Sequence, residues 1–141
     1  MIIGALTADA VDDAVALWHE AELTRPWNDP HQDFRRAVDG ATSAVLAATD
    51  EGGALIGTVM VGHDGHRGWV YYLAVAHAHR RRGVGRNLIR ASEAWLAQRG
   101  VPKVNLMVRN SNRNAVSFYA ALGYEDGDVV VLGRFLDAPR G

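Results

Sequence analysis

The residues best suited to chemistry lie in one stretch, residues 79–87, which reads HRRRGVGRN. Three consecutive arginines precede a Gly-x-Gly pair, and a further arginine follows it directly. Glycines let ligand oxygens reach backbone N–H groups, and arginines add charge-assisted hydrogen bonds to phosphate. The helix predicted from Gly83 would contribute unpaired first-turn amides and the positive end of its dipole. The stretch therefore predicts a cradle for a pyrophosphate group.

Other interpretations of this stretch fit less well. A dinucleotide-binding Rossmann turn needs a third glycine and an acidic residue about 20 positions later, and a Walker loop needs Lys-Ser or Lys-Thr where Arg86 and Asn87 stand. Nucleic-acid binding favours basic residues spread over a whole face, and the net charge here is −1. Arginines that only solvate a helix end would explain the charge but not the paired glycines.

Composition narrows the class of protein. The 141 residues fit a single domain, and 48% of them are hydrophobic, which is enough to build a core. There is no cysteine, which excludes disulfides, a cysteine-ligated zinc site and a cysteine nucleophile. No signal peptide or membrane-spanning run is visible, so we expect a cytoplasmic protein with neither a membrane nor a nucleic acid as partner.

Charge is distributed unevenly along the chain. Residues 1–60 contain ten acidic and three basic side chains, whereas residues 61–141 contain six acidic and twelve basic ones. This separation indicates an anionic ligand at one place and a cationic ligand at another, or simply two differently solvated faces.

The hydrophobic pattern predicts alternating strands and helices. Alternating or apolar runs bounded by turn residues favour strands, and apolar positions at three- and four-residue spacing favour helices. Asp29, Pro30 and Gln32 form an N-cap, a first-turn proline and a capping-box partner. The order predicts an α/β fold with helices on both faces of a mixed sheet. The predicted strands are 2–6, 44–49, 54–62, 69–75, 103–108 and 128–136, and the predicted helices are 8–22, 30–39, 83–99 and 112–122.

Two motifs resemble the signatures of the GNAT acetyltransferase superfamily. Residues 73–85, LAVAHAHRRRGVG, are similar to the family's Arg/Gln-x-x-Gly-x-Gly/Ala turn, and His77 stands where the family often has proline. Residues 112–124, NRNAVSFYAALGY, are similar to its Asn-x-x-Ala, Tyr and Gly-aromatic positions. The resemblance implies a single bacterial-type GNAT domain over residues 1–141, with a twisted sheet of about six to seven strands.

The resemblance implies acetyl-CoA as the cosubstrate. Its pantetheine arm would pair with the backbone of strand 69–75, and Asn112 would bind the arm from the other side. Two neighbouring parallel strands are splayed in this family, often with a bulge, so that the arm can enter the sheet. The pyrophosphate would lie on the amides of residues 81–86. The implied cofactor-binding residues are Leu73, Val75, Arg80, Arg81, Arg82, Gly83, Val84, Gly85, Arg86, Asn112 and Tyr119.

The resemblance further implies that a primary amine attacks the thioester directly in a ternary complex. A backbone N–H of strand 69–75 would stabilise the oxyanion, and Tyr119 would be the general acid that protonates the thiolate. Judged from the residues alone, Tyr119 could be a core tyrosine and Asn112 only an N-cap. Gly83 and Gly85 could equally serve close helix–sheet packing.

The general base is left open by the sequence. Family members that act on protein N-termini can carry a glutamate where this chain has Met107. His66 and Asp64, with His63, are candidates, because a histidine near its ordinary pKa suits the role. Two histidines in a tight turn are weak evidence for a metal, so no metal site is predicted, and a turn held by Asp64 and Gly65 also explains this loop. Glu20, Glu22 and a water chain are further candidates.

The acceptor site in this family is usually built from the first two helices, the loop between them, here LTRPWNDP, and neighbouring strand ends. Trp27, Asn28 and His63 are therefore predicted to bind the acceptor, although Trp27 could instead be a hydrophobic plug. We expect an N-acetyltransferase acting on a small cationic amine or a peptide amine. The alternative is a non-catalytic acyl-CoA-binding regulatory domain. Either could be a monomer or a homodimer formed through strand 128–136.

Overall fold

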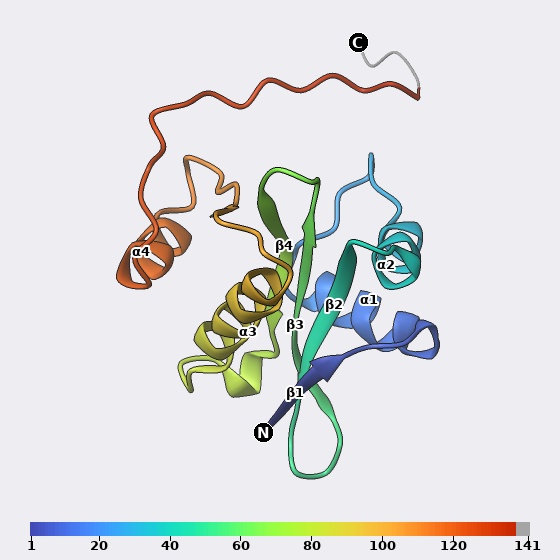
Figure 1. Ribbon diagram of the computed structural model, residues 1–141. Coiled ribbons are helices and arrows are strands. Elements are labelled where there is room, and N and C mark those ends of the chain that lie inside the picture. The colour runs from blue at the N-terminus through green and yellow to red at the C-terminus, as the bar shows by residue number, and fades with distance from the viewer. Residues whose placement is uncertain (138–141) are drawn as a thin grey trace. The chain divides into compact units, whose positions relative to one another are not determined.

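The computed structural model describes residues 1–137, which divide into two compact units, Met1–Met107 and the chain from Val108 onward. The second unit contains the helix α4 (Arg113–Ala121). The first unit contains β1 (Ile2–Ala5), β2 (Ser43–Thr49), β3 (Leu55–His63), β4 (Gly68–Val75), β5 (Val104–Asn105), α1 (Val11–Glu20), α2 (Pro30–Asp39) and α3 (Val84–Gln98), with 3-10 turns at Ala8–Ala10 and His77–His79 (Figure 1).

The sheet of the first unit has the order β1-β2-β3-β4-β5. The first four strands are antiparallel neighbours, and β5 runs parallel to β4. The α/β class is confirmed, but residues 1–137 form five strands rather than six to seven. The predicted strand 128–136 is wrong, because that segment pairs with no strand, and strand 103–108 is reduced to two residues. β-propensity marks residues that suit a sheet, but it supplies no partner strand.

Helices cover both faces of this sheet. A Cβ on Gly57 of β3 would lie 2.9 Å from Leu88 of α3, whereas the neighbouring residue, Thr58, accepts a hydrogen bond from Trp18 of α1 at 2.9 Å. Successive strand residues point to opposite faces, so α3 lies on one face and α1 on the other, as Figure 1 also shows. A Cβ on Gly68 would lie only 2.5 Å from Leu96. These two glycines allow α3 to pack closely.

The core beneath α1 and α2 is built on Trp18 and Phe34, both 0% exposed, with ring centroids 6.1 Å apart. Asp29 caps α2 as predicted, because its Oδ1 accepts from the amides of His31 and Gln32. The predicted helix 8–22 is shorter than expected. The hydroxyl of Thr7 bonds to the Asp9 carboxylate and caps no amide, and α1 begins only at Val11. No helix within residues 1–137 has the length and apolarity needed to cross a membrane.

Candidate active site

One edge of β4 is open for most of its length. β5 pairs only with Gly68 and Trp69, and no other strand of residues 1–137 pairs with this edge. The amide of Ala76 donates to the Ile56 carbonyl at 2.9 Å, so alternation along an antiparallel pair directs the backbone groups of Val75 away from β3. The Val75 carbonyl accepts from Arg80 Nε at 3.2 Å. Its N–H is thus the group available to an extended ligand.

A β-bulge interrupts β4 just before this point. Thr58 lies opposite Ala74 and Met60 opposite Tyr71, so Tyr72 and Leu73 share the single position facing Val59. Tyr72 has φ 53°, a left-handed conformation that costs a non-glycine residue about 1–3 kcal/mol. The strained residue therefore directly precedes Leu73, one of the two residues predicted to bind the pantetheine arm. The family resemblance implies a bulge, but nothing in the local sequence marks its position at Tyr72 and Leu73.

The turn after β4 presents free backbone amides. Arg81 and Gly83 have φ 63° and 82°, and nothing lies within 4 Å of a Cβ built on Gly83. No side chain caps α3, and the amide of Asn87 is the first to bond back into the helix, to the Gly83 carbonyl at 3.0 Å. The amides of residues 84–86 are therefore left without an intrahelical partner. Gly83 serves the shape of the turn and not close packing.

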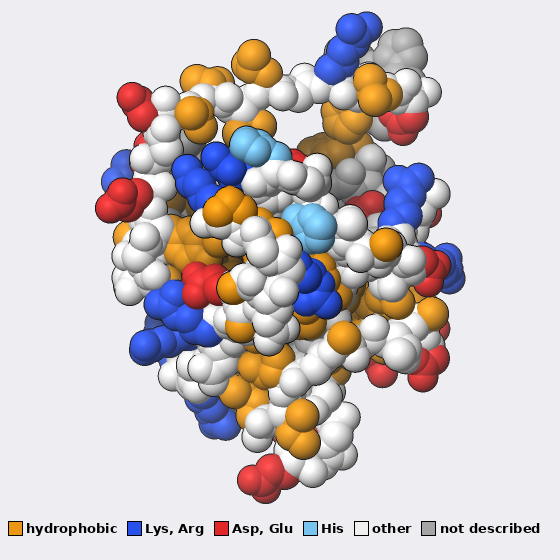
Figure 2. All heavy atoms as spheres, in the orientation of Figure 1, with side chains coloured by type: hydrophobic (Ala, Val, Ile, Leu, Met, Phe, Trp, Pro, Cys, Tyr) orange, Lys and Arg blue, Asp and Glu red, His pale blue; other side chains and the backbone are white. Residues whose placement is uncertain are grey.

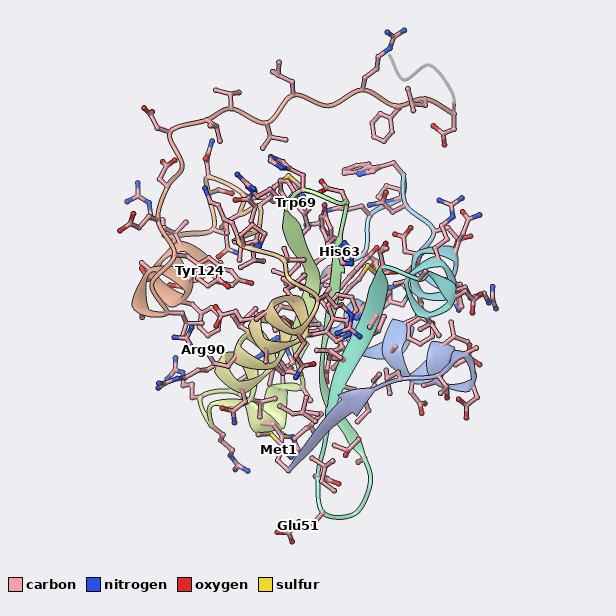
Figure 3. All side chains as sticks on the ribbon, viewed as in Figure 1. Met1, Glu51, His63, Trp69, Arg90 and Tyr124 are labelled. Atoms are coloured by element: carbon pink, nitrogen blue, oxygen red, sulfur yellow. The ribbon has the colours of Figure 1, made fainter. Side chains whose placement is uncertain are left out.

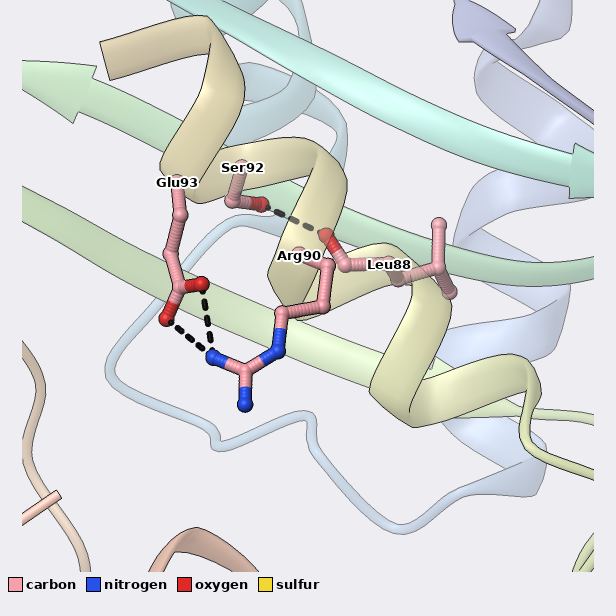
Figure 4. A network of polar contacts seen from close by, with 4 residues as sticks. All are labelled: Leu88, Arg90, Ser92 and Glu93. Carbon is pink, nitrogen blue, oxygen red and sulfur yellow. Dashed lines mark hydrogen bonds and ion pairs between the residues drawn. The ribbon is translucent and has the colours of Figure 1, made fainter. Parts of the chain in front are cut away.

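The arginines around this turn have different partners. Arg81, Arg82 and Arg86 are exposed beside the helix end. Arg90 instead donates from its Nη1 to both carboxylate oxygens of Glu93, at 2.8 and 3.1 Å, next to the buried bond from the Ser92 hydroxyl to the Leu88 carbonyl (Figure 4). Lys and Arg side chains gather at the lower left of the face drawn in Figure 2, where Figure 1 draws the turn between β4 and α3. The turn thus combines positive charge with unpaired amides.

The loop between β3 and β4 is held by Asp64. Its Oδ1 accepts from the amides of Arg67 and His66 at 2.8 and 2.9 Å, and its Oδ2 accepts from Trp69 Nε1 at 3.3 Å. These bonds, the two backbone ones first, lower the pKa of Asp64 below its ordinary value, which makes this carboxylate a weaker base. Gly65 has φ 87°, so the turn predicted from Asp64 and Gly65 is present. Within residues 1–137 no three His, Asp or Glu side chains are grouped as metal ligands.

This loop and the arginine-rich turn lie at opposite ends of β4. His63 pairs with Gly68 at the start of the strand, and its ring lies 6.1 Å from that of Trp95. Figure 3 shows His63 and Trp69 at this end of the sheet and Glu51 at the other. At about 3.3 Å per strand residue, Leu73 lies roughly 16 Å further along. The structure therefore does not bring His63, Asp64 or His66 to Leu73.

The model of the Acetyltransferase (GNAT) family matches residues 9–124. The chain belongs to the GNAT family. It is 41% identical over 128 residues to an acetyltransferase of Yersinia pestis, covering 91% of this chain and 90% of that one. An acetyltransferase of Sodalis glossinidius is 42% identical over 129 residues, with 91% and 90% covered. The GNAT fold and the acetyltransferase class predicted from the sequence are confirmed.

Solved structures show the same fold. The structure of AAC(6')-Iy in complex with the bisubstrate analogue CoA-S-monomethyl-acetylneamine has a TM-score of 0.82 at 18% identity, with 96% of this chain and 97% of that one covered. At this identity the likeness establishes the fold and not the acceptor.

The loop between α1 and α2 is the segment that the sequence predicts to border the acceptor. The guanidinium of Arg25 donates to the carbonyls of Glu22 and Thr24 at 2.9 and 2.8 Å, which ties the loop together. Trp27 is 45% exposed and is therefore not a buried plug, and Asn28 is also exposed. Asp33, at the start of α2, accepts from the Tyr72 phenol at 2.7 Å. Sequence reasoning missed this contact, because it joins residues 39 positions apart.

Asn112 and Tyr119 lie in the second unit. Asn112 Oδ1 accepts from the amide of Ala115 at 3.1 Å, so its predicted role as the N-cap of α4 is confirmed. The ring of Tyr119 meets those of Phe118 and Tyr124 edge-on, with centroids 5.0 and 5.7 Å apart. Burial raises the pKa of Tyr119 to about 12, so the phenol is protonated at neutral pH. The roles of both residues toward the cosubstrate stay predictions.

Proposed function

We propose that this GNAT enzyme transfers the acetyl group of acetyl-CoA to the primary amine of a small cationic acceptor, by direct attack in a ternary complex. The observation that supports this most is the turn at the end of β4. It joins unpaired amides at residues 84–86 to an arginine-rich surface, beside a strand whose outer edge is open. This arrangement suits a ligand that carries a pyrophosphate at one end and an extended amide chain at the other.

The cosubstrate fits this arrangement group by group. The pyrophosphate accepts hydrogen bonds from the amides of residues 84–86, with Arg81, Arg82 and Arg86 alongside. The pantetheine arm continues along β4, where the N–H of Val75 is free to donate. Asn112 uses its Oδ1 as a cap, which leaves its side-chain NH2 as a donor to the arm. Support comes from AAC(6')-Iy, which has been solved in complex with CoA.

Acetyl transfer follows from this placement. The amine nitrogen attacks the thioester carbonyl, a C–N bond forms, and the Leu73 N–H donates to the oxyanion. The C–S bond then breaks, and the thiolate takes the phenolic proton of Tyr119. The proton lost by the amine passes to water, or to Glu20 or Glu22 near the end of α1. Because the chain has no cysteine, no acyl-enzyme forms on a thiol, and much of the rate comes from holding both substrates together.

A cationic acceptor is favoured by the acidic character of residues 1–60. Asp29 and Asp33 lie at the start of α2, beside the loop that carries Trp27. Among the fold neighbours, one aminoglycoside acetyltransferase was solved with sisomicin. The family match includes residues of both units, which supports one catalytic domain over residues 1–141. We propose a small-molecule acceptor and a monomer or homodimer.

An acceptor panel tests this proposal. Purified protein is incubated with acetyl-CoA and, in turn, aminoglycosides, polyamines, amino acids and peptides with a free N-terminus, while free thiol is measured. We expect thiol release that depends on one class of cationic amine. Tight binding of acetyl-CoA with no thiol release for any amine would favour the regulatory acyl-CoA-binding domain instead.

A further inference from the structure

Residues from three other elements hold the bulge in β4. The ring of Tyr72 stacks on that of Trp18 in α1, with centroids 3.9 Å apart and planes within 13°. The Tyr72 phenol donates to Oδ2 of Asp33 in α2 at 2.7 Å, and the Tyr72 carbonyl accepts from the hydroxyl of Thr58 in β3 at 3.2 Å. The left-handed conformation of Tyr72 is therefore fixed at its ring, its hydroxyl and its backbone.

The Thr58 hydroxyl is fully buried and has two partners. It accepts from Trp18 Nε1 at 2.9 Å and donates its only proton to the Tyr72 carbonyl. Both Trp18 and Thr58 are 0% exposed. Because the indole N–H occupies one lone pair of the hydroxyl, the hydroxyl proton is directed at the Tyr72 carbonyl. The three groups form one directed chain from α1 through β3 to β4.

This chain sets the direction of the next amide. The Tyr72 carbonyl and the Leu73 N–H belong to one planar peptide, and none of the peptides of residues 1–137 is cis. In a trans peptide the two groups point in opposite directions. A carbonyl held toward Thr58 therefore aims the Leu73 N–H away from Thr58. That N–H is the donor assigned to the oxyanion in the proposed reaction.

We propose that Thr58, held by Trp18, and the Tyr72 side chain, held by Asp33, position the Leu73 amide for acetyl transfer. The inference rests on the proposed function. These four side chains are positioning residues, because they act on the reacting carbonyl only through the peptide between Tyr72 and Leu73. If the network only stabilised the fold, removing it would not change how the Leu73 amide responds to the acetyl group.

Substitutions at Thr58 separate these two roles. Thr58→Val removes both hydrogen bonds at nearly constant volume, whereas Thr58→Ser keeps the hydroxyl. Tyr72→Phe removes only the bond to Asp33 and keeps the stacked ring. The matched control is Tyr71→Phe, because Tyr71 precedes the bulge in the same strand and is 44% exposed.

The test is the amide resonance of Leu73 in isotope-labelled full-length protein, titrated with CoA and with acetyl-CoA. In the wild type, Thr58→Ser and Tyr71→Phe we expect the resonance to move further with acetyl-CoA than with CoA, because only acetyl-CoA offers a carbonyl. In Thr58→Val this difference is lost, while the affinity for CoA changes by less than about twofold. With the acceptor found in the panel, kcat falls about tenfold and the acetyl-CoA KM stays within about twofold.

Two outcomes would overturn this inference and leave the proposed function standing. One is a wild-type Leu73 amide that responds equally to CoA and acetyl-CoA, and the other is a Thr58→Val variant with the wild-type kcat. If Thr58→Val fails to fold, Tyr72→Phe is tested in its place. We then expect a smaller loss of the difference between the CoA and acetyl-CoA responses of the Leu73 amide. An unchanged difference would contradict the inference. If the wild type bound neither CoA nor acetyl-CoA, the proposed function would fail, and the inference with it.

Discussion

The amide of Asn87 donates to the carbonyl of Gly83 at 3.0 Å, and this bond is the first of α3. Every amide between these two residues lacks an intrahelical partner, at the positive end of a helix that runs to Gln98. Gly83 itself has φ 82°, which turns the chain so that these amides follow the arginines directly.

Gly83→Ala should weaken the binding of CoA. Alanine disfavours a positive φ by about 1–2 kcal/mol, so the turn relaxes and its amides shift. Gly65→Ala is the matched control, because Gly65 has φ 87° and also has open space around its Cβ position. Both variants should unfold at a lower temperature, but only Gly83→Ala should lose affinity for CoA in a calorimetric titration. Equal CoA affinities in the two variants would contradict this role of Gly83.

Arg82→Ala and Arg86→Ala should each raise the acetyl-CoA KM about tenfold and leave kcat unchanged, because a charge-assisted hydrogen bond to phosphate contributes about 1.5–3 kcal/mol. The effect should shrink as salt is added, since both arginines are exposed. Arg99→Ala is the control, because its guanidinium lies 3.7 Å over the ring of Trp95, beyond the other end of α3. Steady-state kinetics at two salt concentrations distinguish these cases. A KM as high in Arg99→Ala as in the other two would count against phosphate contacts.

Tyr119→Phe should bind CoA as the wild type does and lose roughly 100-fold in kcat, because the thiolate would leave without its acid. Tyr124→Phe removes one hydroxyl from the neighbouring ring and should stay within about twofold of the wild-type kcat. Rates at saturating acetyl-CoA provide the comparison. Full activity in Tyr119→Phe would remove this phenol from the mechanism.

We expect Tyr72 to lower the stability of the folded protein at alkaline pH. Burial, and then the bond to the Asp33 carboxylate, raise the pKa of Tyr72 in the folded protein above its ordinary value near 10. Its contribution to stability is complete below pH 10. Above pH 10 the unfolded chain releases this proton first, so the contribution is lost as pH rises toward the folded pKa. Thermal midpoints from pH 8 to 11 should therefore fall more steeply in the wild type than in Tyr72→Phe, and parallel curves would contradict this.

Much of the fold followed from local patterns. The hairpin of β2 and β3, the Asp29 cap of α2 and the apolar stripe of α3 each depend on residues close in the chain, and each is present. The arginine–glycine turn could also be predicted, because a glycine with positive φ and the start of a helix both depend on residues close in the chain.

Features that depend on residues far apart in the chain could not be predicted from local sequence patterns. The bulge at Tyr72 is held by Trp18, Asp33 and Thr58, and no local pattern joins these four positions. The composition of residues 128–136 predicts a strand, yet this segment pairs with no strand of residues 1–137. The distance from His66 to Leu73 depends on the register of β3 and β4, which local patterns do not give.

Amide hydrogen exchange of Val84, Gly85 and Arg86, with and without saturating CoA, tests the central claim most directly. If main-chain amides at the start of α3 hold the pyrophosphate, exchange at these three positions should slow by at least about tenfold when CoA binds, while exchange in the loop of residues 64–67 stays unchanged. Saturation with CoA that left the three amides exchanging at their original rates would contradict the account.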